Sequence, residues 1–183
     1  ISEYLNYGGE NIVCVRADAT LEEGWFYEGA GVYRHVWLNK ADKLHVAPFG
    51  TFVYSEFAVP YSLRGEAGPD LSVASLHIET TVRNMGSAAA SYSLRHTLID
   101  AAGNVAGTCE SEGGLILAKD SHKTLGVMAV ENPHLWSCED PYLYKVMTEV
   151  YADGNLVDRY ETTTGIRHIA FNNDRGFLLN GEV

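Results

Sequence analysis

The dominant feature of the sequence is an alternation of apolar and polar residues that recurs in nearly every segment. Side chains of a β-strand point to opposite faces with a period of two, so this pattern predicts half-buried strands. No long stretch shows apolar residues at the 3.6-residue spacing of an amphipathic helix. The chain is therefore expected to be all-β, with little helix.

Turn-forming residues divide the chain between residues 44 and 171 at intervals of roughly 8 to 12 residues. The turn Ala152-Asp153-Gly154-Asn155 predicts a hairpin, because Asp-Gly and Gly-Asn accept positive φ angles. About seven strands in such an arrangement favour an immunoglobulin-like Greek-key β-sandwich, and another all-β sandwich or a small barrel is the alternative. The alternating segments are Leu44–Phe57, Ser72–Arg83, Ser91–Asp100, Val105–Glu110, Leu115–Ala118, Lys123–Glu131, Tyr142–Tyr151 and Leu156–Thr164.

Residues 1–42 add two further predicted strands, Asn11–Ala17 and Val32–Leu38, around a loop rich in glycine and aromatic residues. An isolated hairpin is marginally stable in water, so these strands need neighbours. They are expected to pack on the sandwich of the same chain or of a second copy, which predicts self-association. The chain begins without methionine and stops just after an apolar run, so it is expected to be part of a longer protein.

Composition excludes several classes of protein. The formal net charge of −11 argues against a nucleic-acid-binding surface. The longest apolar run, Leu115–Ala118, is far shorter than the roughly 20 residues of a membrane-spanning helix, so no membrane span is expected. Cys14, Cys109 and Cys138 are widely spaced and odd in number, which predicts free thiols. No export leader is recognised, and the localisation stays open.

The sequence also carries no motif for a metal or a cofactor. The seven histidines form no H-x-x-x-H pair and no cluster with cysteine, so no metal site is expected. Gly29-Ala30-Gly31 lacks the third glycine and the helix of a dinucleotide fingerprint and is expected to be a tight turn. No G-x-S-x-G elbow supports a Ser-His-Asp arrangement.

Three stretches of the sequence match motifs of one known family, in that family's order. Trp25–Leu38 is similar to the pattern "W-Y-x-G-(A/S)-G-I-Y-R-x-V-x-L", and Glu131–Tyr144 is similar to "N-P-x-L-W-S-x-x-x-P-x-L-Y". The third stretch, Gly165–Gly181, contains Gly165-Ile166-Arg167, Phe171 and Gly176–Gly181. Together they resemble the front half of glycoside hydrolase family 2, which includes β-galactosidases, β-glucuronidases and β-mannosidases. In that family the first pattern ends the jelly-roll sugar-binding domain, and the third stretch is similar to the passage from the sandwich into the catalytic barrel.

This resemblance implies a remnant of the jelly roll in residues 1–42, the immunoglobulin-like sandwich in 43–171, and the lead-in to an absent TIM barrel in 172–183. The family hydrolyses O-glycosidic bonds with two glutamates about 5 Å apart. Both glutamates lie in the barrel, so the resemblance implies a non-catalytic spacer from a β-galactosidase-like parent that acts on carbohydrate. The alternatives are a free-standing carbohydrate-binding or adhesion module and a self-contained hydrolase.

The resemblance also suggests residue roles. In the first domain, Glu23, Trp25 and Tyr27 are candidates for a sugar-facing rim, and burial of Trp25 and Tyr27 in a core or interface is the alternative. Arg34 is expected to pair with a carboxylate between domains.

The second stretch is expected to cross between the sheets, since Pro133 and Pro141 break strand pairing. Leu135 and Trp136 are expected to be apolar plugs at this crossing, and Tyr142 begins the next strand. Glu139-Asp140 is expected to be a solvated turn rather than an acid/base pair. No catalytic residue is therefore assigned to this chain.

Overall fold

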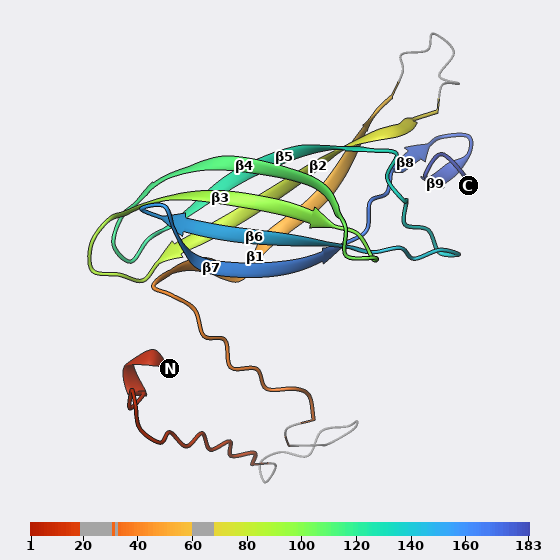
Figure 1. The fold of residues 1–183 in the computed structure, drawn as a ribbon. Coiled ribbons are helices and arrows are strands. Elements are labelled where there is room, and N and C mark those ends of the chain that lie inside the picture. The colour runs from red at the N-terminus through yellow and green to blue at the C-terminus, as the bar shows by residue number, and fades with distance from the viewer. Residues whose placement is uncertain (19–30, 32, 60–67) are drawn as a thin grey trace. The chain divides into compact units, whose positions relative to one another are not determined.

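The computed structural model describes residues 1–18, 31, 33–59 and 68–183. The chain divides into two compact units, Ile1–Lys40 and Ala41–Val183. All the strands that the structure describes belong to the second unit (Figure 1). Within the described ranges, no helix has the length and apolar character needed to cross a membrane.

The first unit contains one short element, the 3₁₀ helix η1 (Ser2–Tyr4), and no strand among its described residues. The predicted strand Asn11–Ala17 and the described part of Val32–Leu38 are therefore wrong. A strand needs a neighbour for its backbone hydrogen bonds, and neither segment has a ladder partner in the described chain. Apolar side chains such as Trp37 remain 77% exposed, and self-association through residues 1–42 stays a prediction.

The second unit is a sandwich of two antiparallel sheets with a small hairpin at one end (Figure 1). The first sheet has the order β1-β2-β5, from β1 (Leu44–Ala58), β2 (Asp70–Asn84) and β5 (Ser121–Glu131). The second has the order β4-β3-β6-β7, from β3 (Ala90–Ile99), β4 (Val105–Ile116), β6 (Tyr144–Ala152) and β7 (Asn155–Thr164). Because the chain crosses back to pair β5 with β2 and again to pair β6 with β3, the predicted immunoglobulin-like Greek-key sandwich is confirmed.

The alternation in the sequence produces the core directly. In β2, Leu76, Ile78 and Val82 are fully buried, as is Thr80, and the residues that alternate with these four turn to the outer face. They meet residues of the facing sheet such as Leu98 and Val150, which are also fully buried. Burial of each such side chain contributes about 1.5–3 kcal/mol, so the packing of the two inner faces holds the sandwich together.

Strand β4 joins two segments that the sequence predicts as separate strands. The segments Val105–Glu110 and Leu115–Ala118 were expected to be separate strands, but β4 runs continuously through the glycine pair between them. Its register against β3 shifts at Tyr92/Ser93, which leaves Gly113 in a bulge. A Cβ at Gly113 would lie 2.5 Å from the Tyr92 ring, so the glycine lets the strand bend closely over this aromatic side chain.

Two hairpins complete the unit. Asp153 and Gly154 have φ angles of 51° and 75°, and they form the predicted tight turn between β6 and β7. Beyond β7, the strands β8 (Ile169–Asn172) and β9 (Gly176–Leu179) pair as a separate two-stranded sheet. The alternation pattern predicts neither of these strands: residues 169–171 were expected at the end of the sandwich, and residues 172–183 in the lead-in to the barrel.

Candidate functional site

Residues 132–143, the crossing segment, carry the chain from β5 in one sheet to β6 in the other. Asn132 N donates a hydrogen bond to the Ser72 carbonyl oxygen at 2.6 Å, and Trp136 N donates to the Ile166 carbonyl oxygen at 2.8 Å. Pro133 lies between these two contacts. The crossing segment is thus fastened by backbone hydrogen bonds to strand β2 and to the segment after β7.

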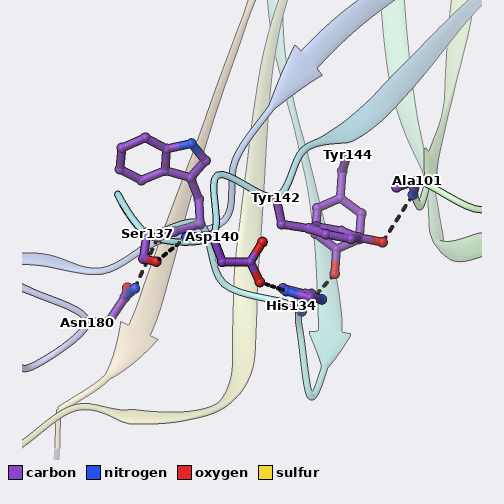
Figure 2. A network of polar contacts seen from close by, with 8 residues as sticks. Ala101, His134, Ser137, Asp140, Tyr142, Tyr144 and Asn180 are labelled. Atoms are coloured by element: carbon purple, nitrogen blue, oxygen red, sulfur yellow. Dashed lines mark hydrogen bonds and ion pairs between the residues drawn. The ribbon is translucent and has the colours of Figure 1, made fainter.

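An aromatic and charged cluster forms the middle of the crossing segment (Figure 2). His134 Nε2 lies 2.6 Å from Asp140 Oδ2, and the His134 ring stacks on Tyr142 with centroids 3.9 Å apart. His134 N donates to the Tyr144 hydroxyl at 2.8 Å, and Ala101 N donates to the Tyr142 hydroxyl at 3.1 Å. Burial raises the pKa of the Tyr144 hydroxyl above its usual value.

Ser137 completes a serine, a histidine and an aspartate within this cluster, but their order does not suit nucleophilic catalysis. Ser137 Oγ accepts a hydrogen bond from Asp140 N at 3.0 Å, and Asp140 lies between Ser137 and His134. In a catalytic triad the histidine must lie between the nucleophile and the carboxylate. Nor do the described residues contain a group of three or more His, Cys, Asp or Glu side chains that could hold a metal ion.

Leu135 and Trp136 occupy different environments at the crossing. Leu135 is partly buried and packs against the core cluster that contains Leu76 and Leu98. Trp136 is half-buried at the end of the sandwich, where a Cβ on Gly165 would approach its Cγ to 2.9 Å. The Arg167 guanidinium carbon lies 5.1 Å from the Trp136 ring centroid, so a cation–π contact covers the outer side. Pro141 is exposed, and Tyr142 is half-buried. Strand β6 begins at Tyr144, so the prediction that Tyr142 begins the strand is wrong: Tyr142 belongs to the crossing segment, where its ring stacks on His134.

Asn180 connects the crossing segment to the β8–β9 hairpin (Figure 2). Its Oδ1 accepts a hydrogen bond from His168 N at 2.9 Å, and its Nδ2 donates to the Trp136 carbonyl oxygen at 3.1 Å. Its backbone N donates to the His168 carbonyl oxygen at 2.8 Å, and its φ of 53° is left-handed. The sequence motifs predict no role for Asn180, although the Asn180-Gly181 dipeptide is a signal for a positive-φ turn.

The structure says less about the candidate site residues that the sequence predicts within residues 1–42. Glu23, Trp25 and Tyr27 lie outside the described residues, so their proposed rim role stays a prediction. The Arg34 guanidinium carbon lies 5.3 Å from the centroid of the Tyr33 ring. None of the ion pairs between described residues includes Arg34, and its partnership with a carboxylate between domains also stays a prediction.

A groove with a volume of about 750 Å³ opens along the edge of the sandwich. Residues 52–57 of β1 form one wall, and residues 163–165 and 167–169 form the other, with Leu143 contributing from the crossing segment. The two walls are bridged at Ser55, whose Oγ donates to the Arg167 carbonyl oxygen at 2.8 Å and accepts from Arg167 N at 3.1 Å. The groove therefore lies between the free edges of the two sheets.

The fold and the crossing segment define the class of protein, an all-β protein built on an immunoglobulin-like sandwich. The family model for glycosyl hydrolases family 2 matches residues 61–167, and the chain belongs to this family. The resemblance noted in the sequence is thereby confirmed.

Relatives and solved structures agree with this assignment. The chain is 31% identical to β-galactosidase BoGH2A of Bacteroides ovatus over 99% of its length and 30% identical to a β-glucuronidase of Formosa agariphila over all of it. It spans only 20% of each of these proteins. A family 2 glycosyl hydrolase of Bacteroides cellulosilyticus has a TM-score of 0.71 and 28% identity, with 85% of this chain and 20% of that chain covered. A β-glucuronidase of Bacteroides uniformis has a TM-score of 0.69 and 26% identity, with 89% and 19% covered.

Proposed function

We propose that this chain is the non-catalytic sandwich region of a longer, β-galactosidase-like family 2 glycoside hydrolase. In that enzyme it acts as a spacer that holds the sugar-binding and catalytic parts in fixed positions. Residues 1–42 then correspond to the end of the jelly roll, 43–171 to the sandwich, and 172–183 to the start of the catalytic barrel. The similarity to β-galactosidases and β-glucuronidases of which the chain spans about a fifth supports this proposal.

The observation that carries the proposal is the attachment of the β8–β9 hairpin to the sandwich by Asn180. A spacer must transmit a fixed orientation to the polypeptide that follows it. Asn180 contributes two side-chain hydrogen bonds, one to His168 and one to Trp136, and thereby joins the hairpin to the crossing segment. A flexible linker between independent modules would have no such connection.

The chemistry of the described residues also favours a structural role. Retaining hydrolysis needs one carboxyl group as nucleophile and a second as acid/base. The pair that most resembles an acid/base pair here is Asp140 with the imidazole of His134, rather than two carboxyl groups. The side chains of His134 and Asp140 are 49% and 62% exposed. Stacking on Tyr142 holds His134 in place and leaves the pair on the surface of a turn. It serves to shape the crossing segment.

The proposal is tested by comparing this chain with the complete protein that its gene encodes. We expect the complete protein to hydrolyse an aryl β-galactoside and the 183-residue chain to show no turnover. Turnover by the 183-residue chain that disappears with Asp140→Asn would contradict the proposal. A complete protein without glycosidase activity would contradict it as well.

The spacer role is tested separately by hydrogen exchange of Asn180→Ala. We expect faster exchange of the β8–β9 amides with unchanged exchange in β2 and β6, because only the hairpin loses its attachment. Asn155→Ala is the matched control, since the Asn155 side chain donates its hydrogen bond to the Asp153 carbonyl oxygen within the β6–β7 turn. Unchanged hairpin exchange in Asn180→Ala would show that the attachment does not hold the hairpin.

The groove supports a second candidate function, that of a carbohydrate-binding module. Its wall includes Phe52 and Tyr54, and aromatic rings of this kind can stack on sugars. Calorimetric titration of the 183-residue chain with galactose, glucuronic acid and mannose oligosaccharides separates the two candidates. Binding that is lost in Tyr54→Ala would favour the module, and no binding is expected for the spacer.

A further inference from the structure

We infer that Asn180 is a site of spontaneous deamidation, and that the β8–β9 hairpin controls the reaction by holding the side-chain amide in hydrogen bonds. The modification converts the amide that attaches the hairpin to the crossing segment into a carboxylate. The inference goes beyond the proposed function, since it concerns the chemistry of one turn and holds whether or not the chain is a spacer.

The Asn180-Gly181 dipeptide is the chemical basis of the inference, because Asn180 is the one asparagine in the sequence that precedes glycine. Cyclisation requires the backbone nitrogen of the following residue to reach the side-chain carbonyl carbon. Glycine has no Cβ to shield this nitrogen or to restrict φ and ψ, so the approach is easiest there. Asn180 and Gly181 are both half-buried, so water has access to the ring that forms.

The reaction needs only water as a co-reactant. The Gly181 nitrogen loses its proton and bonds to Asn180 Cγ, while the bond from Cγ to Nδ2 breaks and Nδ2 leaves with that proton as ammonia. The product of this step is a cyclic succinimide. Water then adds to one of the two ring carbonyl carbons and opens the ring, which gives aspartate at one carbon and isoaspartate at the other. The net change replaces an amide with a carboxyl group.

The turn fixes the backbone around the reacting peptide bond. Asn180 and Gly181 occupy the central positions of a two-residue turn, and their φ angles of 53° and 85° are typical of type I′. Leu179 N donates to the Glu182 carbonyl oxygen at 2.8 Å, and Glu182 N donates to the Leu179 carbonyl oxygen at 3.0 Å. The backbone on both sides of Asn180-Gly181 is therefore held in one conformation.

The side-chain amide of Asn180 is held at both of its polar atoms (Figure 2). Oδ1 accepts a hydrogen bond from His168 N at 2.9 Å, and Nδ2 donates to the Trp136 carbonyl oxygen at 3.1 Å. Ring closure turns the amide toward Gly181 and expels Nδ2, so it breaks this attachment. The rate of deamidation therefore follows the fraction of molecules with an open hairpin. Two hydrogen bonds of ordinary strength keep that fraction at about a tenth or less.

The product cannot restore the attachment. A carboxylate at position 180 still accepts a hydrogen bond from His168 N, but it has no hydrogen to donate to the Trp136 carbonyl oxygen. Two acceptor oxygens then face each other where the 3.1 Å hydrogen bond lies now, which is unfavourable. The isoaspartate product also adds a backbone carbon to a turn whose length matches the type I′ geometry. Deamidation therefore releases the hairpin from the crossing segment.

The first test measures deamidation by mass spectrometry of the peptide that contains Asn180, after incubation of the 183-residue chain at pH 8. The reference is the same chain unfolded in urea at the same pH. We expect the reaction to be at least about tenfold slower in the folded chain, because only the open hairpin reacts. Asn104, which precedes valine, is the internal control and should stay unmodified in both samples.

The second test loosens the hairpin without changing Asn180-Gly181. Leu178 is 9% exposed in β9, so Leu178→Ala weakens the packing of the hairpin and should raise the rate by at least about threefold. Leu125→Ala is the matched control, since Leu125 is 50% exposed in β5, and it should leave the rate unchanged. Hydrogen exchange of the β2 amides checks that both variants keep the folded sandwich.

Four outcomes would overturn the inference. Equal rates in the folded and the unfolded chain would show that the hydrogen bonds of Asn180 do not protect it. The absence of reaction in urea would show that Asn180 is not a deamidation site. Equal rates in Leu178→Ala and the wild type would exclude control by the hairpin. The deamidated chain, separated by ion exchange, should exchange its β8–β9 amides faster, and unchanged exchange would refute the release.

Discussion

The buried histidine of the core makes stability depend on pH in a way that can be calculated. His96 in β3 is fully buried, with Nδ1 3.1 Å from Thr148 Oγ1 and Nε2 3.3 Å from Ser111 Oγ. Gly126 of the facing sheet covers the ring so closely that a Cβ there would lie 2.8 Å from His96 Cδ2. Burial lowers the pKa of His96 from 6.5 to about 4, since the neighbouring hydroxyls offer no negative charge to an imidazolium.

The sign of the effect follows from proton binding. When the pH falls below 6.5, the histidine of the unfolded chain takes up a proton and His96 in the folded chain does not, so unfolding becomes more favourable. The stability is complete above the unfolded pKa and is lost between pH 6.5 and about 4. At about 1.36 kcal/mol per pKa unit, the full loss is about 3 kcal/mol, of which about 2 kcal/mol is reached by pH 5.

The test compares the wild-type chain with His96→Gln by urea unfolding, followed by tryptophan fluorescence between pH 8 and pH 5. Glutamine keeps a polar side chain near Thr148 but does not titrate. The variant can be less stable at every pH, so the measured quantity is the pH-dependent difference in unfolding free energy. We expect the free energy of the wild type to fall by about 2 kcal/mol more than that of the variant by pH 5.

The internal control is the range from pH 7.5 to 8, where the two curves should be parallel because neither state binds a proton at this site. Parallel curves down to pH 5 would refute the reasoning, since they would show that His96 takes up its proton as readily in the folded chain as in the unfolded one. A ring resonance of His96 that titrates near pH 6.5 in the folded protein would refute it directly.

Three further predictions concern single positions. Gly113→Ala should lower the unfolding free energy by about 1–3 kcal/mol in urea titrations, because the new Cβ would collide with Tyr92. Glu149→Gln should lower the pKa of Tyr151 in a spectrophotometric titration, because the hydrogen bond from the Tyr151 hydroxyl to Glu149 raises this pKa above its usual value. Cys109 should react with a thiol reagent only after unfolding, because burial raises its pKa to about 11.

Each of these predictions has a matched control in the chain. Gly68→Ala should leave the unfolding free energy unchanged, since no atom lies within 4 Å of a Cβ built there. Glu161→Gln removes an ion pair with Lys145 and should leave the Tyr151 titration unchanged. Cys14 and Cys138 are exposed and should react in the folded chain. The first prediction would be contradicted if Gly113→Ala left the unfolding free energy unchanged. The second would be contradicted by an unchanged Tyr151 titration in Glu149→Gln, and the third by rapid reaction of Cys109 in the folded chain.

The sequence alone was sufficient to predict the sandwich fold. Alternation specifies which side chains of a strand face inward, and this is a local property that can be read without knowing the partner strand. The prediction for Ser72–Arg83 therefore lies within β2, and its alternate residues form the core. The Asp153-Gly154 turn was equally predictable, because φ preferences belong to the residues themselves.

Pairing and burial were decided only by the tertiary structure. Asn11–Ala17 has the alternation of a strand and forms none, because a strand also needs hydrogen-bonding neighbours that the local sequence does not specify. Gly113 and Gly114 indicated a break, yet Gly114 pairs with Tyr92 of the adjacent strand and only Gly113 forms a bulge, so β4 continues through both glycines. The links from Asn180 to Trp136 and from His96 to Thr148 span 44 and 52 residues. Contacts of this kind arise when the sheets pack, so their energetic effects depend on positions that only the folded chain brings together.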